Sequence, residues 1–237
     1  MTFTPVTMTQ KTLFRVFLAS LTLFAAGNAC SQSPASSPKQ ALTFRTLGAD
    51  CAPEGLNVLS GSNAVAVSIQ QGVRSLPQTY AGASPMVFFR VVTGKDGKPS
   101  QVPVASVDLS QAGNYPLFVF LKGPKGPDQP IVQVLREDAK SFPAGVYRAV
   151  NDTTNALTIT FGSVAMPVPP LSVRDHKAEA EILTLGITAQ EVPAPYQALR
   201  ANIGMLPDKR TLILAIPPAS PGGHVQIQRH TDGVPAQ

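Results

Sequence analysis

The chain has 237 residues, of which 43% are hydrophobic and 14% are charged, and its formal net charge is +5. This composition excludes a largely disordered protein and supplies enough apolar material for one large core or two smaller ones. The basic residues form no run, so we expect no nucleic-acid partner. Trp is absent and only 4 Tyr occur, which makes the usual stacking platforms for sugars and bases scarce.

Residues 1–29 have the pattern of an export signal. Lys11 and Arg15 precede an uncharged apolar segment, 16–26, and small residues follow it. About a dozen apolar residues are too few to cross roughly 30 Å of hydrocarbon as a permanent helix. The alternative, a buried core helix, leaves the small residues and the polar tract after them unexplained. We therefore predict an extracytoplasmic protein.

The end of this segment resembles the lipobox of bacterial lipoproteins, in which small residues precede a Cys that is acylated. Residues 27–30 read Gly-Asn-Ala-Cys, with Gly27 where the motif normally has Leu. Residues 30–40 are Ser/Pro-rich at their start, which is typical of a solvated tether. The resemblance implies lipidation of Cys30, and Ser31 implies an outer-membrane or cell-surface lipoprotein with the membrane as partner. The alternative is ordinary cleavage after Ala29, which gives a periplasmic or secreted protein.

Only two cysteines occur, Cys30 and Cys51. If Cys30 is acylated, Cys51 is a single thiol. If the signal is cleaved in the ordinary way, the two can form a disulfide that closes a loop of about 20 residues and stabilises the fold by roughly 3 kcal/mol. Two cysteines alone cannot make a structural zinc site, which needs four ligands.

Alternation of apolar and polar residues predicts strands through most of the remaining chain. Half-buried strands are predicted where every second residue is apolar, namely around 65–70, 157–161 and 225–228. Continuously apolar runs predict central strands covered on both faces, namely 86–92, 117–121 and 212–216. Residues 178–185 have a helical composition, but the β-branched residues after them favour a strand. Gly- and Pro-rich turns separate these segments.

A weak internal repeat organises the strands. Residues 132–136 (Val-Gln-Val-Leu-Arg) match 225–229 (Val-Gln-Ile-Gln-Arg), and 42–45 correspond to 145–148. Two units of about 95 residues follow, each the right length for an immunoglobulin-like β-sandwich of short strands. We predict an all-β fold with two tandem antiparallel β-sandwich domains, 41–138 and 139–237. The alternative is one continuous sandwich whose apolar hairpins look alike.

Phe44-Arg45 near the start of the first unit and the run at 142–151, which opens the second, carry a resemblance to a family. With the lipoprotein-like signal, the chain resembles uncharacterised exported bacterial proteins, which are similar to tandem immunoglobulin-like sandwich domains of unknown function. The resemblance covers nearly all of the mature chain. Its motifs are packing motifs, and it implies no site residue.

Few residues are candidates for chemistry. His224 and His230 fall on or beside the last strand, but six residues of strand span about 20 Å, too far for one metal ion. Asp175 and His176 could belong to a hydrolytic triad, yet no nucleophile motif accompanies them. Neighbouring acids also occur, but Glu137 and Asp138 fall in a linker and Glu179 and Glu181 on a solvated face. The glycines of 123–126 alternate with Pro and make no phosphate loop. We assign no catalytic, cofactor or metal residue.

Five arginines lie in or at the end of apolar strands, where a guanidinium can pair with a carboxylate or bond to backbone carbonyls. They are Arg45, Arg90, Arg136, Arg148 and Arg229. The alternative is a set of anion-recognition points for acidic envelope polymers or lipid headgroups.

The pattern as a whole predicts a non-enzymatic cell-envelope protein that acts as a lipid-anchored binding or assembly module, with an unknown envelope protein or polymer as partner. Loops at 94–100, 123–130 and 217–223 are candidate contact sites. Two alternatives remain. One is an envelope-directed hydrolase with a site near Asp175, His176 or His224. The other is a chaperone-like or sensor module that captures a strand at an exposed sheet edge.

Overall fold

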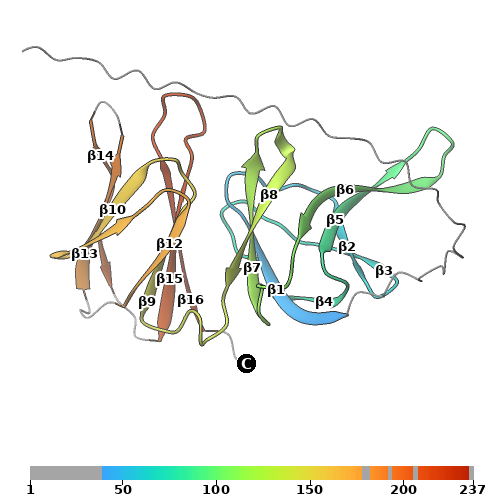
Figure 1. Cartoon of the computed structure of the whole chain (residues 1–237), viewed down its shortest axis with the longest axis horizontal. Coiled ribbons are helices and arrows are strands. Elements are labelled where there is room, and N and C mark those ends of the chain that lie inside the picture. Colours follow the sequence, from blue (N-terminus) through green and yellow to red (C-terminus); the bar gives the residue numbers. More distant parts are fainter. Residues whose placement is uncertain (1–38, 178–181, 192–193, 205–207, 235–237) are drawn as a thin grey trace, which may run out of the picture. The chain divides into compact units, whose positions relative to one another are not determined.

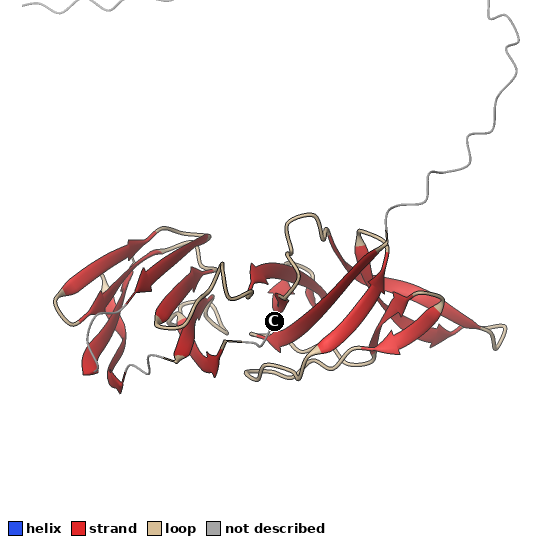
Figure 2. Cartoon of the chain, turned by 90° about the horizontal axis from the view of Figure 1, so that it is seen from below, coloured by secondary structure: helices blue, strands red, loops and turns tan. Residues whose placement is uncertain are grey.

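A computed structural model describes residues 39–177, 182–191, 194–204 and 208–234. This part of the chain contains strands and no helix (Figure 2), and so no helix that is long and apolar enough to span a membrane. The proposed signal, the tether up to residue 38, Cys30 and the acids Glu179 and Glu181 lie outside the described residues.

Eight strands form the first sandwich. Its bounds in chain order are β1 (Gln40–Gly48), β2 (Leu56–Ser60), β3 (Asn63–Ala66), β4 (Gln78–Gly82), β5 (Met86–Thr93), β6 (Pro99–Val107), β7 (Pro116–Gly123) and β8 (Gly126–Arg136). They make one sheet in the order β4-β1-β7-β8 and a facing sheet in the order β3-β2-β5-β6 (Figure 1).

Eight further strands repeat this arrangement. They are β9 (Val146–Asn151), β10 (Ala156–Phe161), β11 (Val164–Val168), β12 (Ser172–Lys177), β13 (Ile182–Gln190), β14 (Tyr196–Gly204), β15 (Lys209–Ile216) and β16 (Gln226–Gly233). Their sheets have the orders β12-β9-β15-β16 and β11-β10-β13-β14, the first two orders with eight added to each label. The predicted all-β fold with two sandwiches is therefore confirmed.

One sheet of each sandwich departs from the purely antiparallel prediction. β1 pairs with β7 in parallel, and β9 pairs with β15 in parallel, whereas every other strand ladder is antiparallel. Parallel neighbours need a long connection. Here the connection is most of a sandwich, because the first strand of each repeat lies beside the seventh.

Three apolar cores hold these sheets together. The first sandwich encloses Phe44, Phe88, Phe118 and Phe120, whose rings contact one another. The second sandwich encloses a separate core around Ile159, Leu185 and Ile187, in which the rings of Tyr147 and Phe161 also lie. We call the third the shared core, because strands of both sandwiches contribute to it. Its buried members are Leu47, Ala49, Leu117, Val119, Leu121, Leu135, Phe142, Val146, Val150, Leu212, Leu214 and Ile216.

The shared core explains two of the continuously apolar runs. In β7, Phe118 and Phe120 face the first core while Leu117, Val119 and Leu121 face the shared core. β15 has the same arrangement, with Ile213 and Ala215 facing the second core. The prediction that both strands are covered on both faces is confirmed.

The same prediction for residues 86–92 is wrong. Val87, Val91 and Val92 are 36%, 50% and 40% exposed. β5 belongs to the outer sheet of the first sandwich, so the first core covers only one of its faces. An apolar run alone does not reveal whether a second layer covers a sheet.

The strand repeat has a defined register. Arg45 lies opposite Leu117, and Arg148 lies opposite Leu212. With Arg45 and Arg148 taken as equivalent, Leu135 corresponds to His230, because these residues pair with Leu117 and Leu212. By the same ladders Gln133 corresponds to Gln228, 95 positions later. The sequence match had aligned Gln133 with Gln226, an error of two residues. Such a slip leaves the alternation unchanged and is invisible to a pattern comparison.

Candidate functional site

The hydrolytic candidates do not converge. Asp175 pairs with Arg148 on β9, whereas His176 pairs with Tyr147. Successive residues of a strand point to opposite faces, so the two side chains leave the sheet on different sides. The ring of His176 stacks on Phe161, with centroids 4.2 Å apart and planes 17° apart. His224 precedes β16 and lies against the ring of Tyr196. Within the described residues, no hydrogen bond joins any two of the three.

Asp175 has a structural role. Its carboxylate accepts two hydrogen bonds from Arg148, at 2.9 Å from Nε and 2.8 Å from Nη2. The same guanidinium donates to the carbonyls of Arg136 and Ser141, at 2.6 and 2.5 Å, and lies 4.4 Å from the ring centroid of Phe142. Arg148 thus ties β9 and β12 to the connection that follows β8.

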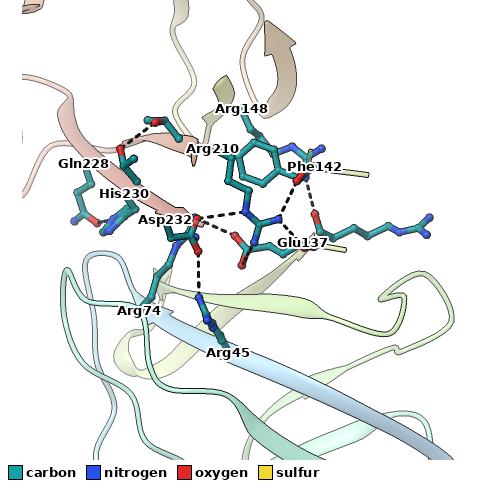
Figure 3. Close-up of polar contacts among 12 residues, drawn as sticks. Arg45, Arg74, Glu137, Phe142, Arg148, Arg210, Gln228, His230 and Asp232 are labelled. Carbon is teal, nitrogen blue, oxygen red and sulfur yellow. Dashed lines mark hydrogen bonds and ion pairs between the residues drawn. The ribbon is translucent and has the colours of Figure 1, made fainter. Parts of the chain in front are cut away.

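The densest group of ionisable side chains is a buried ion cluster that joins the two sandwiches (Figure 3). It consists of Arg45 on β1, Arg74 in the β3–β4 connection, Glu137 after β8, Arg210 on β15 and Asp232 on β16. Glu137 and Arg210 are each 1% exposed. Glu137 lies in the connection between β8 and β9, as predicted, and its side chain and that of Phe142 in the same connection are buried.

Both carboxylates of the cluster are shared between arginines. Arg74 lies 2.9 Å from Glu137 Oε1 and 2.6 Å from Asp232 Oδ2. Arg210 lies 3.5 Å from Glu137 Oε2 and 3.3 Å from Asp232 Oδ1, and Arg45 lies 3.1 Å from Asp232 Oδ2. The contacts of Arg74 with Glu137 and Asp232, and that of Arg210 Nη2 with Glu137, are ion pairs by distance without hydrogen-bond geometry. The cluster holds three guanidinium groups against two carboxylates.

Arg210 makes further contacts that fix it in place. Its Nη1 donates to the backbone carbonyls of Glu137 at 2.6 Å and Phe142 at 2.9 Å. Its guanidinium also lies 4.8 Å from the ring centroid of Phe142, a ring that Arg148 contacts as well. A buried charge is costly unless it is paired and hydrogen-bonded, and these contacts supply both conditions.

Burial and charge at the buried ion cluster shift the pKa values of Glu137 and His230. Burial raises the pKa of the Glu137 carboxyl, although Arg74 and Arg210 act in the opposite direction. Burial, together with Arg74, lowers the pKa of His230 to about 4, against the opposing effect of Asp232. His230 is therefore neutral at pH 7. Its Nε2 lies 3.4 Å from Gln228 Oε1, and Gln228 donates from Nε2 to the Ala49 carbonyl across the shared core at 2.7 Å.

Pairing of the strand-end arginines with carboxylates is confirmed for most of the set. Arg45, Arg90 and Arg148 pair with Asp232, Asp128 and Asp175, and Arg136 lies 3.6 Å from Asp138. Arg229 is exposed, and no ion pair joins it to another described residue. Sequence reasoning missed Arg74 and Arg210. Arg210 lies two residues before the apolar run 212–216. An arginine this close to a strand predicted to be covered on both faces was the available signal for a buried arginine.

The remaining candidates lie at the surface or in shallow places. A hollow of about 420 Å³ beside β1 and β4 is lined by uncharged residues, among them Ser60, Thr79, Tyr80 and Asn114. Within the described ranges, no three His, Cys, Asp or Glu side chains are grouped as metal ligands. Cys51 is buried in the first core, and burial, with Asp50, raises its pKa to about 11.

Comparison with known proteins adds no identity. No protein-family model matches the chain. No curated protein matches it in sequence either. The site must therefore be interpreted from its own geometry.

Proposed function

We propose that this chain is a non-enzymatic protein of the cell envelope that acts by presenting surfaces for binding or assembly, and that a lipid on Cys30 holds it to a membrane. The export-type segment, the lipobox-like residues 27–30 and the Ser/Pro-rich tether support the location. If Cys30 is not acylated, cleavage after Ala29 leaves the same body in the periplasm or the medium.

One observation carries the binding role. The ionisable groups that a hydrolase would need are engaged in packing: Asp175 holds Arg148, and His176 stacks on Phe161 from the opposite face of the same strand. The buried ion cluster is likewise filled by contacts between the two sandwiches. Arginines are poor proton donors and acceptors near neutral pH, so the cluster serves as a clamp. The surface that remains for contact with a binding partner then consists of strand edges and loops.

The loops differ from their predicted extents. Gly94–Lys98 forms an exposed turn between β5 and β6. Residues 126–130, by contrast, belong to β8, so only the short turn before them connects β7 to β8. The β15–β16 connection, 217–225, is largely exposed and carries His224. These segments remain candidate contact sites.

Complementation in the native host tests the proposal. A strain that lacks the gene should recover its wild-type phenotype with the single variants Asp175→Asn, His176→Gln and His224→Gln, provided that each protein accumulates normally. A folded variant that fails to restore the phenotype would instead support the hydrolase. Intact mass of the membrane-purified protein tests the anchor: a diacylglycerol or triacyl mass increment on Cys30 is expected, and Cys30→Ala should abolish it.

A further inference from the structure

In each sandwich, the last strand of one sheet lies next to the last strand of the facing sheet, and we call the line between these two strands the seam. The two sandwiches differ along this seam. In the first sandwich β6 lies alongside β8, and Val104, Val132 and Val134 pack against the first core. In the second sandwich the corresponding strands, β14 and β16, approach each other at few points. At the start of β14, the amide of Val225, the residue before β16, donates to the Tyr196 hydroxyl at 2.7 Å.

The repeats differ in the residue type at one position along this seam. In the register defined by the ladders, Val134 corresponds to Arg229. Arg229 follows Ile227 on the face of β16 that packs against the second core, and it is exposed. A guanidinium cannot replace a valine in an apolar contact between two sheets, because it must remain solvated or paired. The seam of the second sandwich therefore stays open at Arg229.

The opposite side of the seam is apolar and incompletely covered. Leu199 and Ala201 on β14 point toward the second core, since they pair with Ile187 and Leu185 of β13. Both are only half-buried, as is Ile227 across the seam. An additional extended segment at this edge would cover the side chains of Leu199, Ala201 and Ile227. One side chain of the segment would then lie beside Arg229.

β14 is also the longest edge strand that lacks Pro, although its ladder with β13 has a register shift between Ile187 and Thr188. Natural edge strands are usually short, charged or interrupted by Pro. β6, β8 and β11 contain Pro, β3 and β4 have four and five residues, β12 carries several charges, and β16 has eight residues with Arg229 and Asp232 as charges. β14 has nine residues, no Pro and only Arg200 as a charge. Within the described chain, β13 is its sole strand neighbour.

We propose that β14 accepts an extended peptide segment of another protein as an added strand, inserted into the seam with alternate apolar side chains on Leu199, Ala201 and Ile227 and an acidic side chain on Arg229. Main-chain hydrogen bonds to the edge would give affinity, and the alternation with one carboxylate would give selectivity. Charge complementarity selects this partner, because Arg229 is exposed on the core-facing side of β16 and no ion pair joins it to another described residue. The inference rests on the proposed binding function and specifies its partner class.

A designed peptide tests the proposal on the full-length protein. The probe is a fluorescein-labelled nonapeptide, Val-Thr-Val-Thr-Asp-Thr-Val-Thr-Val, whose Val and Asp side chains lie on one face when it is extended. Saturable binding is expected by fluorescence anisotropy, with amide chemical shifts changing along β14. A peptide with Lys in place of Asp should bind on the order of tenfold more weakly. A peptide N-methylated at every residue should not bind, since neither of its edges then has an N–H group to donate to a ladder.

Protein variants locate the site. Arg229→Glu should lower affinity for the Asp peptide by on the order of tenfold and reverse the preference between the Asp and Lys peptides. Arg174→Glu, a matched change at an exposed arginine of β12, should leave both affinities unchanged. If Arg229→Glu does not fold, Arg229→Gln replaces it, with loss of the preference expected. The inference would be overturned if the Asp peptide did not bind, or if the N-methylated peptide bound equally well. It would also be overturned if Arg229→Glu and Arg174→Glu changed the peptide affinities equally. These outcomes do not affect the complementation test, so failure of the seam and failure of the proposed function can be told apart.

Discussion

Removal of Arg210 from the buried ion cluster should destabilise the protein strongly. Arg210→Met keeps a long side chain of similar volume but removes the charge and all of its hydrogen bonds. The Glu137 and Phe142 carbonyls then lose donors at 2.6 and 2.9 Å, while Glu137 keeps Arg74 and Asp232 keeps Arg74 and Arg45. Arg210 is 1% exposed, so water does not readily replace the lost donors.

The magnitude follows from the contacts that are lost. Each buried acceptor left without a donor costs about 1–3 kcal/mol, and breaking a buried ion pair by removing one partner costs about 3–5 kcal/mol. These terms overlap because they concern one side chain, and the new methionine recovers some apolar packing. A net loss of about 4 kcal/mol is expected. For a chain of this length that corresponds to a fall in Tm of roughly 8–16 °C.

Urea denaturation followed by far-ultraviolet circular dichroism measures the loss, and calorimetry gives the Tm. Arg174→Met, at an exposed arginine, is the matched control and should change the free energy of unfolding by less than about 0.5 kcal/mol. Glu137→Met should cost less in the Arg210→Met background than in the wild type, because it then removes a carboxylate that has already lost one partner. A loss below 1 kcal/mol for Arg210→Met, or strict additivity of the two changes, would refute the assignment of the cluster as a clamp.

Three further outcomes are expected. The pKa of His230 is about 4 in the folded protein, against 6.5 ordinarily. As the pH falls, His230 is therefore protonated in the unfolded chain before it is protonated in the folded one. The free energy of unfolding should fall by up to about 3 kcal/mol from pH 6.5 to 4. His230→Gln should remove that loss. The comparison is made in an Asp152→Asn background, because the raised pKa of Asp152, about 6, makes stability change with pH in the opposite direction. An unchanged pH dependence in His230→Gln would contradict the lowered pKa of His230. Leu214→Ala in the shared core should cost about 2–5 kcal/mol in urea unfolding, and a cost below 1 kcal/mol would mean that the sheets do not pack there. In a Cys30→Ala protein, Cys51 should resist a thiol reagent at pH 8 until urea unfolds the chain, whereas rapid labelling of the native protein would contradict its burial.

The sequence was sufficient to predict strands where one physical constraint dominates. In 157–161 the alternation is regular, and Leu157, Ile159 and Phe161 are buried in the second core. The runs in β7 and β15 were also correctly predicted as covered on both faces, since each apolar residue has a core to face. Val87 and Val91 look the same in sequence but face outward, because coverage depends on which sheets stack, and that is a property of the tertiary fold.

The buried ion cluster could not be predicted in the same way. Its members come from positions 45, 74, 137, 210 and 232, and a pairing between β1 and β16 or between the β3–β4 connection and β15 is not visible in local spacing. Arg45 was recognised as a strand-end arginine that needs a carboxylate. Its partner, Asp232, lies on the last strand of the other sandwich, and local sequence spacing does not reveal the interface that brings the two together.

The repeat shows where function is best sought in this chain. Positions of β7 and β15 that face the shared core stay apolar in both copies, as with Leu117 and Leu212 or Val119 and Leu214, because each sheet must cover the other; on β8 and β16 the copies differ, since Leu135 corresponds to His230. Glu137 and Asp232 are likewise 95 positions apart and supply the two carboxylates of the clamp. Packing alone therefore explains where the copies agree. It does not explain an exposed arginine at 229 where the other copy has a packed valine, since valine would close the seam and stabilise the second sandwich. The difference leaves Arg229 exposed beside the edge of β14, and addition of a strand is the use that this geometry allows.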